Sequence, residues 1–260
     1  MFLTKVIISI VCFLPMWHIS ICQNAQDKVD AFEAHVFSSS SGIDMPYRVF
    51  VPEDYDNTKS YPIIMYLHGG AGAGDDNIKQ ISGGNTTGTH VWITPENQAK
   101  YPTFVVAPQL LGFNRWNDPD SLHLSKYGQI AIDLLKDLQQ KYSIDPSRIY
   151  LTGQSRGGYG TWDIAGKYPD LFAAAVPLCG GGNLYTVKAM KDLPIWAFHG
   201  AQDSTVSVEK SRVMVAALQK VGGNIKYTEY REMGHSVWNK AYVEPELIEW
   251  LFVQRRKSNE

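Results

Sequence analysis

The sequence predicts a single α/β domain, with a mostly parallel central sheet and helices on both of its faces. Short apolar runs alternate with amphipathic stripes along the chain, which is typical of repeated strand–helix units. The chain has 260 residues, of which 44% are hydrophobic, enough for one sizeable core. Because no linker, repeat or charge block interrupts the alternation, we expect one domain over residues 23–260.

The apolar runs give the predicted strands. Residues 35–37 and 47–51 are expected to form an antiparallel pair, joined through residues 38–42. Pro62–Leu67 is apolar throughout, as expected of a strand that is buried on both faces. Five further strands are predicted, at residues 103–107, 148–152, 173–177, 195–198 and 225–230.

Four helices are predicted between and after these strands. Residues 130–142 place apolar side chains at helical spacing, with charged side chains on the other side. Residues 155–167 and 214–221 form the next two predicted helices, and Pro245 can open the last one because proline is tolerated in the first turn.

The N-terminus has the composition of a secretory signal peptide. Lys5 supplies a positive charge, Val6–Trp17 is almost wholly apolar, and small residues surround a possible cleavage point before Gln23. We therefore expect a signal peptide over residues 1–22, a secreted or periplasmic protein, and no stable membrane insertion after cleavage. Two alternatives stay open, which are lipid attachment at Cys22 and an uncleaved anchor.

Charge and cysteine content exclude some functions. The formal net charge is −2 with 19% charged residues, so there is no basic excess to favour nucleic acid or an anionic membrane as a partner. Of the three cysteines, Cys12 and Cys22 lie in the predicted leader, which leaves only Cys179. A single cysteine cannot form an internal disulfide, and Cys179 is expected to be a buried apolar residue.

One motif carries most of the chemical information. The segment Gly153–Gly157 matches G-x-S-x-G, between a predicted strand and a predicted helix. In that context the serine sits on a strained turn, so that its hydroxyl projects freely at the helix N-terminus. The motif predicts an α/β-hydrolase fold with Ser155 as the nucleophile of a serine hydrolase.

A serine hydroxyl needs a base at neutral pH, and in this fold the acid and then the histidine follow the serine along the chain. Only His199 and His235 lie downstream of Ser155. His199 ends an apolar run and is expected to structure the turn that holds the acid. His235 lies in a predicted loop between a strand and a helix, and it is our candidate base; the alternative is an ordinary surface histidine.

The acid is predicted to be Asp203. It lies just after a predicted strand, where a carboxylate can orient the imidazole. Asp163 and Asp170 compete by composition, but each belongs to a helix or its exit and is expected to face solvent.

The oxyanion hole needs fixed donors, and backbone amides serve this purpose. The amide of Arg156, directly after the nucleophile, is one candidate. The other lies in the loop His68–Gly72, where Gly70 is preferred and Ala71 is the second choice, because glycine allows close backbone approach. A phosphate-binding loop is disfavoured, since no lysine followed by serine or threonine has the required spacing.

Several segments together resemble a family of secreted α/β-hydrolases known as predicted peptidases or esterases. The chain is also similar to carbohydrate esterase family 1, which contains feruloyl and acetyl-xylan esterases, and more distantly to polyhydroxybutyrate depolymerases and prolyl oligopeptidases. The resemblance runs from about Tyr47 to the C-terminus, with its specific points at Leu67–Gly69, Ala107–Gln109, Gly157–Trp162, Cys179–Gly182 and His199–Asp203. It implies ester hydrolysis by the triad named above. Arg156 departs from the methionine often found after the nucleophile, which places a cation near the site or in an ion pair behind it.

Candidate substrate contacts are Trp116, Tyr159 and Trp238, because aromatic faces suit a sugar or phenolic ester. The alternative is that both tryptophans only pack in a lid, and that Tyr159 belongs to the core. No cofactor is expected, and no metal site, because no histidine or carboxylate cluster has ligand spacing.

The predicted function is therefore that of a serine esterase acting on a small or polysaccharide-linked carboxylic ester. Two alternatives are a serine peptidase of prolyl-oligopeptidase-like type and a non-catalytic binding protein on the same fold.

Overall fold

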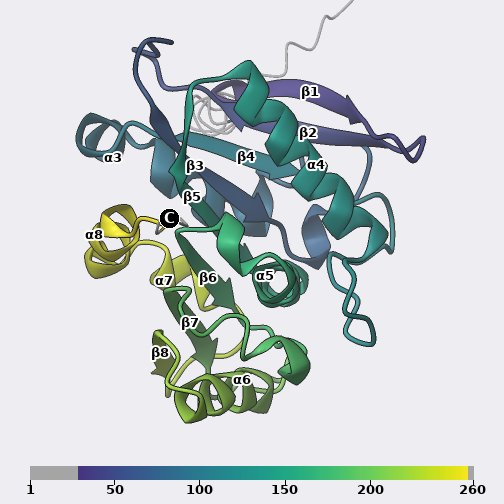
Figure 1. Cartoon of the computed structure of the whole chain (residues 1–260), viewed down its shortest axis with the longest axis vertical. Coiled ribbons are helices and arrows are strands. Elements are labelled where there is room, and N and C mark those ends of the chain that lie inside the picture. Colours follow the sequence, from purple (N-terminus) through teal and green to yellow (C-terminus); the bar gives the residue numbers. More distant parts are fainter. Residues whose placement is uncertain (1–28, 257–260) are drawn as a thin grey trace, which may run out of the picture.

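The computed structural model describes residues 29–256, which form one eight-stranded sheet with helices on both faces (Figure 1). The predicted signal peptide, with Cys12 and Cys22, lies outside the described residues. The strands are β1 Glu33–Ser38, β2 Asp44–Phe50, β3 Tyr61–Leu67, β4 Phe104–Pro108, β5 Ile144–Gln154, β6 Ala174–Leu178, β7 Ile195–Gly200 and β8 Ile225–Tyr230.

The strands are arranged in the order β1-β2-β4-β3-β5-β6-β7-β8. The opening pair β1–β2 is antiparallel, as predicted, and β2 is also antiparallel to β4. From β4 onwards every neighbouring pair is parallel. The carboxyl ends of β5, β7 and β8 therefore meet at one edge of the sheet, which is where α/β proteins place their functional residues.

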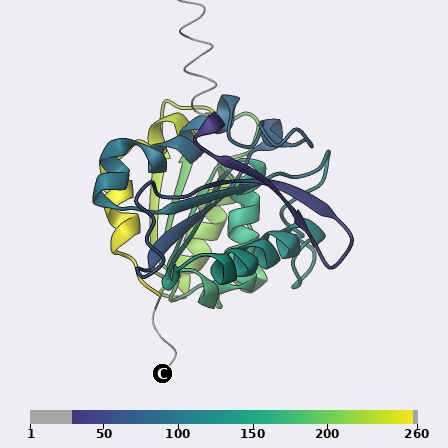
Figure 2. The same cartoon turned by 90° about the horizontal axis from the view of Figure 1, so that it is seen from above.

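The helices form two layers, and Figure 2 shows the twisted sheet between them. One core cluster joins the sheet to α4 Lys126–Lys141, α5 Arg156–Lys167 and α6 Glu209–Lys220. A second cluster joins the opposite face to α7 Trp238–Ala241 and α8 Pro245–Val253. The remaining helical segments are α2 Thr86–His90, α3 Pro95–Lys100 and the 3-10 turns η1 Gly70–Gly72, η2 Gly83–Asn85, η3 Val91–Ile93, η4 Pro169–Leu171 and η5 Leu184–Thr186.

The predicted elements are present, and the differences have local causes. All seven residues of β3 are buried, because helices cover both faces of this central strand. The stretch between β3 and β4 contains α2 and α3, which are too short to show a helical period in the sequence. Among residues 29–256, no helix combines the length and the apolar character that a membrane span requires.

Candidate active site

Ser155 occupies the turn between β5 and α5 in a strained conformation. Its φ of 55° and ψ of −116° lie in a region that residues with a side chain rarely adopt. The Ser155 amide donates to the Leu178 carbonyl at 2.9 Å, and the Ser155 carbonyl accepts from the Tyr159 amide at 3.0 Å. Strain of this kind costs about 1–3 kcal/mol and persists only where the surroundings enforce it.

Two glycines after the serine allow the turn to pack against neighbouring strands. A Cβ atom on Gly157 would lie 1.8 Å from the carbonyl oxygen of Leu67 in β3. A Cβ atom on Gly158 would lie 2.1 Å from the carbonyl oxygen of Leu178 in β6. Both atoms belong to the backbone of central strands, so no side-chain movement could relieve either clash.

The three residues predicted as a triad form a continuous hydrogen-bonded chain. His235 Nε2 lies 2.9 Å from Ser155 Oγ, and His235 Nδ1 lies 2.6 Å from Asp203 Oδ2. A carboxylate only accepts, so Nδ1 carries the proton and Nε2 can accept from the serine hydroxyl. The amides of Thr205 and Val206 donate to the other oxygen of Asp203, at 2.9 and 2.8 Å.

These donors determine the ionisation of Asp203, whose side chain is fully buried. Burial alone would raise the pKa of this carboxyl group. The hydrogen bonds from His235 and from the Val206 and Thr205 amides outweigh that effect, so the pKa of Asp203 is lowered from its ordinary value. The acid therefore stays ionised and can hold His235 in one tautomer.

His199 supports the same carboxylate, which confirms the expectation that it structures this turn. Its Nε2 lies 3.2 Å from Asp203 Oδ2 and 3.0 Å from the Val206 carbonyl. Both partners only accept, so Nε2 carries a proton. Burial lowers the pKa of His199, so the ring acts as a neutral donor to the acid.

The predicted oxyanion loop runs beside the nucleophile. A Cβ atom on Gly69 would lie 3.6 Å from Ser155 Cβ. Gly70 is the first residue of η1 and Arg156 is the first residue of α5, so neither amide has a partner within its own helix. The Gly69 amide, in contrast, is already bonded to Asn85 Oδ1 at 3.1 Å. The use of the Gly70 and Arg156 amides as oxyanion donors stays a prediction that this geometry allows.

The His68 side chain holds the oxyanion loop in place through two hydrogen bonds. Its Nδ1 donates to the Gly69 carbonyl at 2.6 Å, and its Nε2 accepts from the Leu110 amide at 2.9 Å. Burial lowers the pKa of His68 to about 4, which keeps Nε2 free of a proton and able to accept. A Cβ atom on Gly72 would lie 2.5 Å from this ring, which explains the third glycine of the loop.

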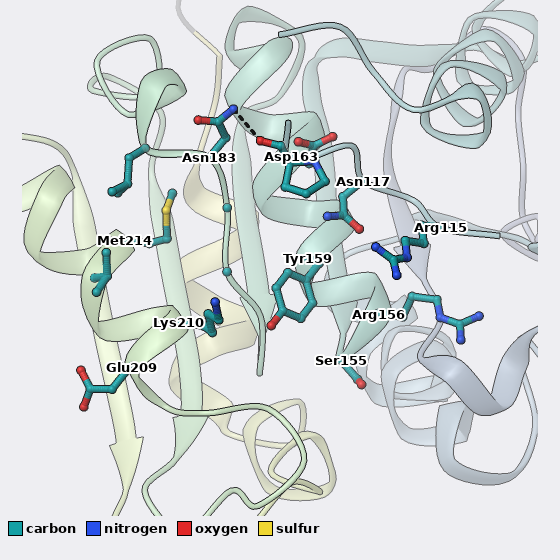
Figure 3. Close-up of a pocket in the computed structure, with 15 residues that line it drawn as sticks. Arg115, Asn117, Ser155, Arg156, Tyr159, Asp163, Asn183, Glu209, Lys210 and Met214 are labelled. Atoms are coloured by element: carbon teal, nitrogen blue, oxygen red, sulfur yellow. Dashed lines mark hydrogen bonds between the residues drawn. The ribbon is translucent and has the colours of Figure 1, made fainter. Parts of the chain in front are cut away.

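A cavity of about 800 Å³ opens next to Ser155, and Figure 3 shows its wall. Loops after β4 and β6 form two of its sides, and α5 and α6 contribute the others. The residues that line it are Arg115, Asn117, Pro119, Ser155, Arg156, Tyr159, Asp163, Gly181, Gly182, Asn183, Leu184, Glu209, Lys210, Val213 and Met214.

Of the three aromatic residues predicted to contact substrate, only Tyr159 lines this cavity. The prediction for Trp116 is wrong, because its side chain is fully buried and donates to the His68 carbonyl at 3.2 Å. The same correction applies to Trp238, which is 8% exposed and packs edge-on against His235 with 5.1 Å between ring centroids. Both tryptophans pack beneath the site, so the packing alternative holds for them.

Asp163 was expected to face solvent, and this expectation is also wrong. Its carboxylate forms an ion pair with Lys167 at 2.8 Å, and both side chains are 2% exposed. The Asp118 amide donates to Asp163 at 3.1 Å, and Lys167 Nζ donates to the Asp118 carbonyl at 2.9 Å. The pair therefore ties α5 to the loop after β4. Asp170 is exposed, as expected.

Cys179, His199 and Asp203 form a cluster that the sequence did not indicate. One potential ligand atom from each lies within 4.8 Å of the others, because β6 and β7 are neighbouring strands. Each group already has a partner here, and the Cys179 thiol donates to the His235 carbonyl at 3.3 Å. Burial raises the pKa of this thiol well above its ordinary value. Cys179 and His199 therefore pack behind His235 and Asp203.

Known proteins resemble this chain in both fold and sequence. A structure of a thermostable esterase shares 40% identity at a TM-score of 0.84, covering 88% of this chain and 64% of that one. A ferulic acid esterase structure, at 16% identity and a TM-score of 0.68, supports the fold alone.

In two curated relatives, the match with this chain covers only a small part of the relative's length. Poly(3-hydroxyalkanoate) depolymerase C of Paucimonas lemoignei is 35% identical over 97 residues, covering 35% of this chain and 23% of that protein. The bifunctional acetylxylan esterase/xylanase XynS20E of Neocallimastix patriciarum is 26% identical, covering 67% of this chain and 24% of that protein. The chain thus spans only about a quarter of these two relatives.

The family itself follows from a longer match. The sequence pattern of the phospholipase/carboxylesterase family matches residues 55–244, which is well over half of the chain. This stretch contains the Gly69–Gly72 loop, the strained serine and both of its hydrogen-bonded partners. The chain therefore belongs to the phospholipase/carboxylesterase family of α/β-hydrolases.

Proposed function

We propose that the protein hydrolyses carboxylic esters, with Ser155 as nucleophile, His235 as general base and Asp203 as the acid that orients it. The observation that carries this proposal is the continuous hydrogen-bonded chain from Ser155 Oγ through His235 to Asp203. A serine in that arrangement is activated because the imidazole accepts its proton as it attacks. Membership of the phospholipase/carboxylesterase family supports ester hydrolysis over other acyl transfers.

The reaction proceeds in two halves. Ser155 Oγ attacks the ester carbonyl while His235 Nε2 takes the hydroxyl proton, and the amides of Gly70 and Arg156 stabilise the oxyanion. His235 then gives its proton to the leaving alcohol. Water, deprotonated by the same imidazole, releases the acyl group and restores the serine.

The substrate class proposed is an ester of a carbohydrate or phenolic acid. Support comes from the acetylxylan esterase/xylanase of Neocallimastix patriciarum and from feruloyl esterase B of Talaromyces stipitatus, which is 41% identical over 49 residues and is covered by this chain over 14% of its length. The volume of the cavity beside Ser155, about 800 Å³, suits a group larger than acetate.

We also propose that the protein is exported through the leader at residues 1–22 and acts outside the cytoplasm, on a small or polysaccharide-linked ester and without a nucleic-acid partner. The composition of the leader supports export. So does the 26% identity over 217 residues to an uncharacterized secreted protein of Arthroderma benhamiae.

The test is hydrolysis of an ester panel by the wild type, by Ser155→Ala and by Ser40→Ala, which removes an exposed hydroxyl from the β1–β2 turn. The panel contains p-nitrophenyl acetate, p-nitrophenyl octanoate, methyl ferulate and acetylated xylan. We expect activity in the wild type and in Ser40→Ala, and a loss of at least about 10³-fold in Ser155→Ala. Equal inertness of all three proteins would refute the proposal.

A further inference from the structure

The cavity beside Ser155 carries an uncompensated positive charge. Arg115, Arg156 and Lys210 all line it. Within residues 29–256, none of these three cations has a carboxylate within ion-pair distance. Three cations without partners in one concave wall attract an anion more strongly than the same charges on a convex surface, because the low-dielectric walls focus the field.

The acidic residues of the wall do not cancel this charge. Glu209 pairs with Arg212, which does not line the cavity and also pairs with Glu229. Asp163 is paired with the buried Lys167. Lys167 thus neutralises Asp163, and the three cations of the wall outnumber its one remaining carboxylate, so the net charge that faces the cavity is positive.

Arg156 lies close to the reacting atoms, and Arg115 lines the same cavity. Arg156 directly follows the nucleophile, and its guanidinium lies 3.7 Å from the position of a Cβ atom on Gly70, so it runs along the oxyanion loop. Its only protein hydrogen bond within the described part of the chain is a long one, 3.4 Å to the Asn114 carbonyl. Figure 3 shows Arg115 and Arg156 on one side of the cavity, with Lys210 across from them beyond the Tyr159 ring.

The position of His235 indicates which part of an ester this cavity receives. His235 must reach the leaving alcohol in order to protonate it. It is not among the residues that line the cavity, which favours the other side of Ser155 for the alcohol. The acyl group is then the part that extends along Arg156, Tyr159 and Arg115.

We infer that the preferred substrates carry a carboxylate on the acyl side, so that they are half-esters of dicarboxylic acids. A guanidinium binds a carboxylate through two parallel hydrogen bonds, and such charge-assisted pairs are stronger than neutral ones. This inference rests on the proposed ester hydrolysis and specifies its substrate class.

The test compares two esters that differ only in the terminal charge. Mono(4-nitrophenyl) adipate ends in a carboxylate, and 4-nitrophenyl 5-carbamoylpentanoate ends in a neutral amide of similar size. We expect the wild type to favour the half-ester by about tenfold or more in kcat/KM, since hydrogen bonds to charged groups support a difference of that size. High salt should reduce this ratio because it screens the cations.

Variants of residues that line the cavity test whether the cavity causes the preference for the half-ester. Arg115→Met and Lys210→Met should each lower the ratio of the two kcat/KM values at least about threefold. Lys136→Met is the matched control, because it removes one charge from an exposed position on α4 outside the cavity, and it should leave the ratio unchanged.

The outcomes separate the two proposals. If the neutral ester is hydrolysed in a Ser155-dependent manner but the ratio is near one, or if neither variant lowers it, the inference is wrong while the esterase proposal stands. If neither ester is hydrolysed, or if Ser155→Ala retains the activity, the proposed function itself fails.

Discussion

The buried ion pair between Asp163 and Lys167 should be essential to stability. The substitution Lys167→Met keeps an apolar stem of similar length and removes the charge. Both side chains are 2% exposed, so the Asp163 carboxylate would remain buried without its cation. Breaking a buried pair in this way typically costs about 3–5 kcal/mol. The Asp118 amide still donates to Asp163, so we expect the lower end of that range.

Urea unfolding followed by circular dichroism measures the free energy of unfolding. A loss of about 3 kcal/mol corresponds to a Tm lower by about 6–12 °C in a domain of this size. Burial already raises the pKa of Asp163 in the wild type, and loss of Lys167 should raise this pKa further. A carboxyl group whose pKa is higher in the folded than in the unfolded state destabilises the fold as the pH rises from the unfolded-state pKa to the folded-state pKa. The deficit of Lys167→Met should therefore shrink as the pH is lowered from about 8 to about 5.

The matched control is the double variant Asp163→Leu/Lys167→Met, which removes both charges. It should be more stable than Lys167→Met, because no buried charge is left unpaired. A loss below about 1 kcal/mol in Lys167→Met, the value typical of exposed pairs, would refute the reasoning. So would a double variant less stable than the single one.

Three further predictions follow from the packing around the site. Gly157→Ala should abolish ester hydrolysis and lower the Tm, because the new Cβ atom would lie 1.8 Å from the Leu67 carbonyl oxygen; normal activity would contradict the account of the turn. The free energy of unfolding should fall as the pH is lowered from about 6.5 to 4. In this range His68 binds a proton in the unfolded state but not in the folded state, where its pKa is about 4. The variant His68→Gln, unfolded in urea at both pH values, should show a smaller fall. Cys179 should resist iodoacetamide at pH 8 in the native protein and react in urea, because burial raises its pKa; peptide mapping that finds native Cys179 alkylated would contradict this.

The sequence was sufficient for features that depend on local pattern. Strand β3 could be predicted because all of its positions are apolar, and Ser155 because its motif stands between a strand and a helix. Asp203 and His235 followed from their order along the chain and from their places after strands. Each of these inferences uses only local sequence and the order of residues along the chain, and the structure places the three residues in hydrogen-bonding distance.

Features that depend on which surfaces meet could not be predicted. Trp116 lies in a loop, and it is buried because α5 and His68 pack against it: a Cβ atom on Gly160 would lie 2.4 Å from Trp116 Cβ. Asp163 is polar and helical, which usually means exposure, and it is buried because the loop at Asp118 covers it. The cluster of Cys179, His199 and Asp203 depends on the pairing of β6 and β7.

The contact of Gly157 and Gly158 with strands β3 and β6 has a consequence for how proteins of this kind diverge. The nucleophile is positioned by the backbone of the sheet, whereas the cavity wall, apart from residues of α5, is built from loops after β4 and β6 and from α6. Insertions and substitutions in those loops can therefore accumulate without displacing Ser155. The backbone that holds the nucleophile and the loops that line the cavity are separate parts of the chain. Related proteins can therefore differ in the ester that they cleave while they keep the same catalytic mechanism.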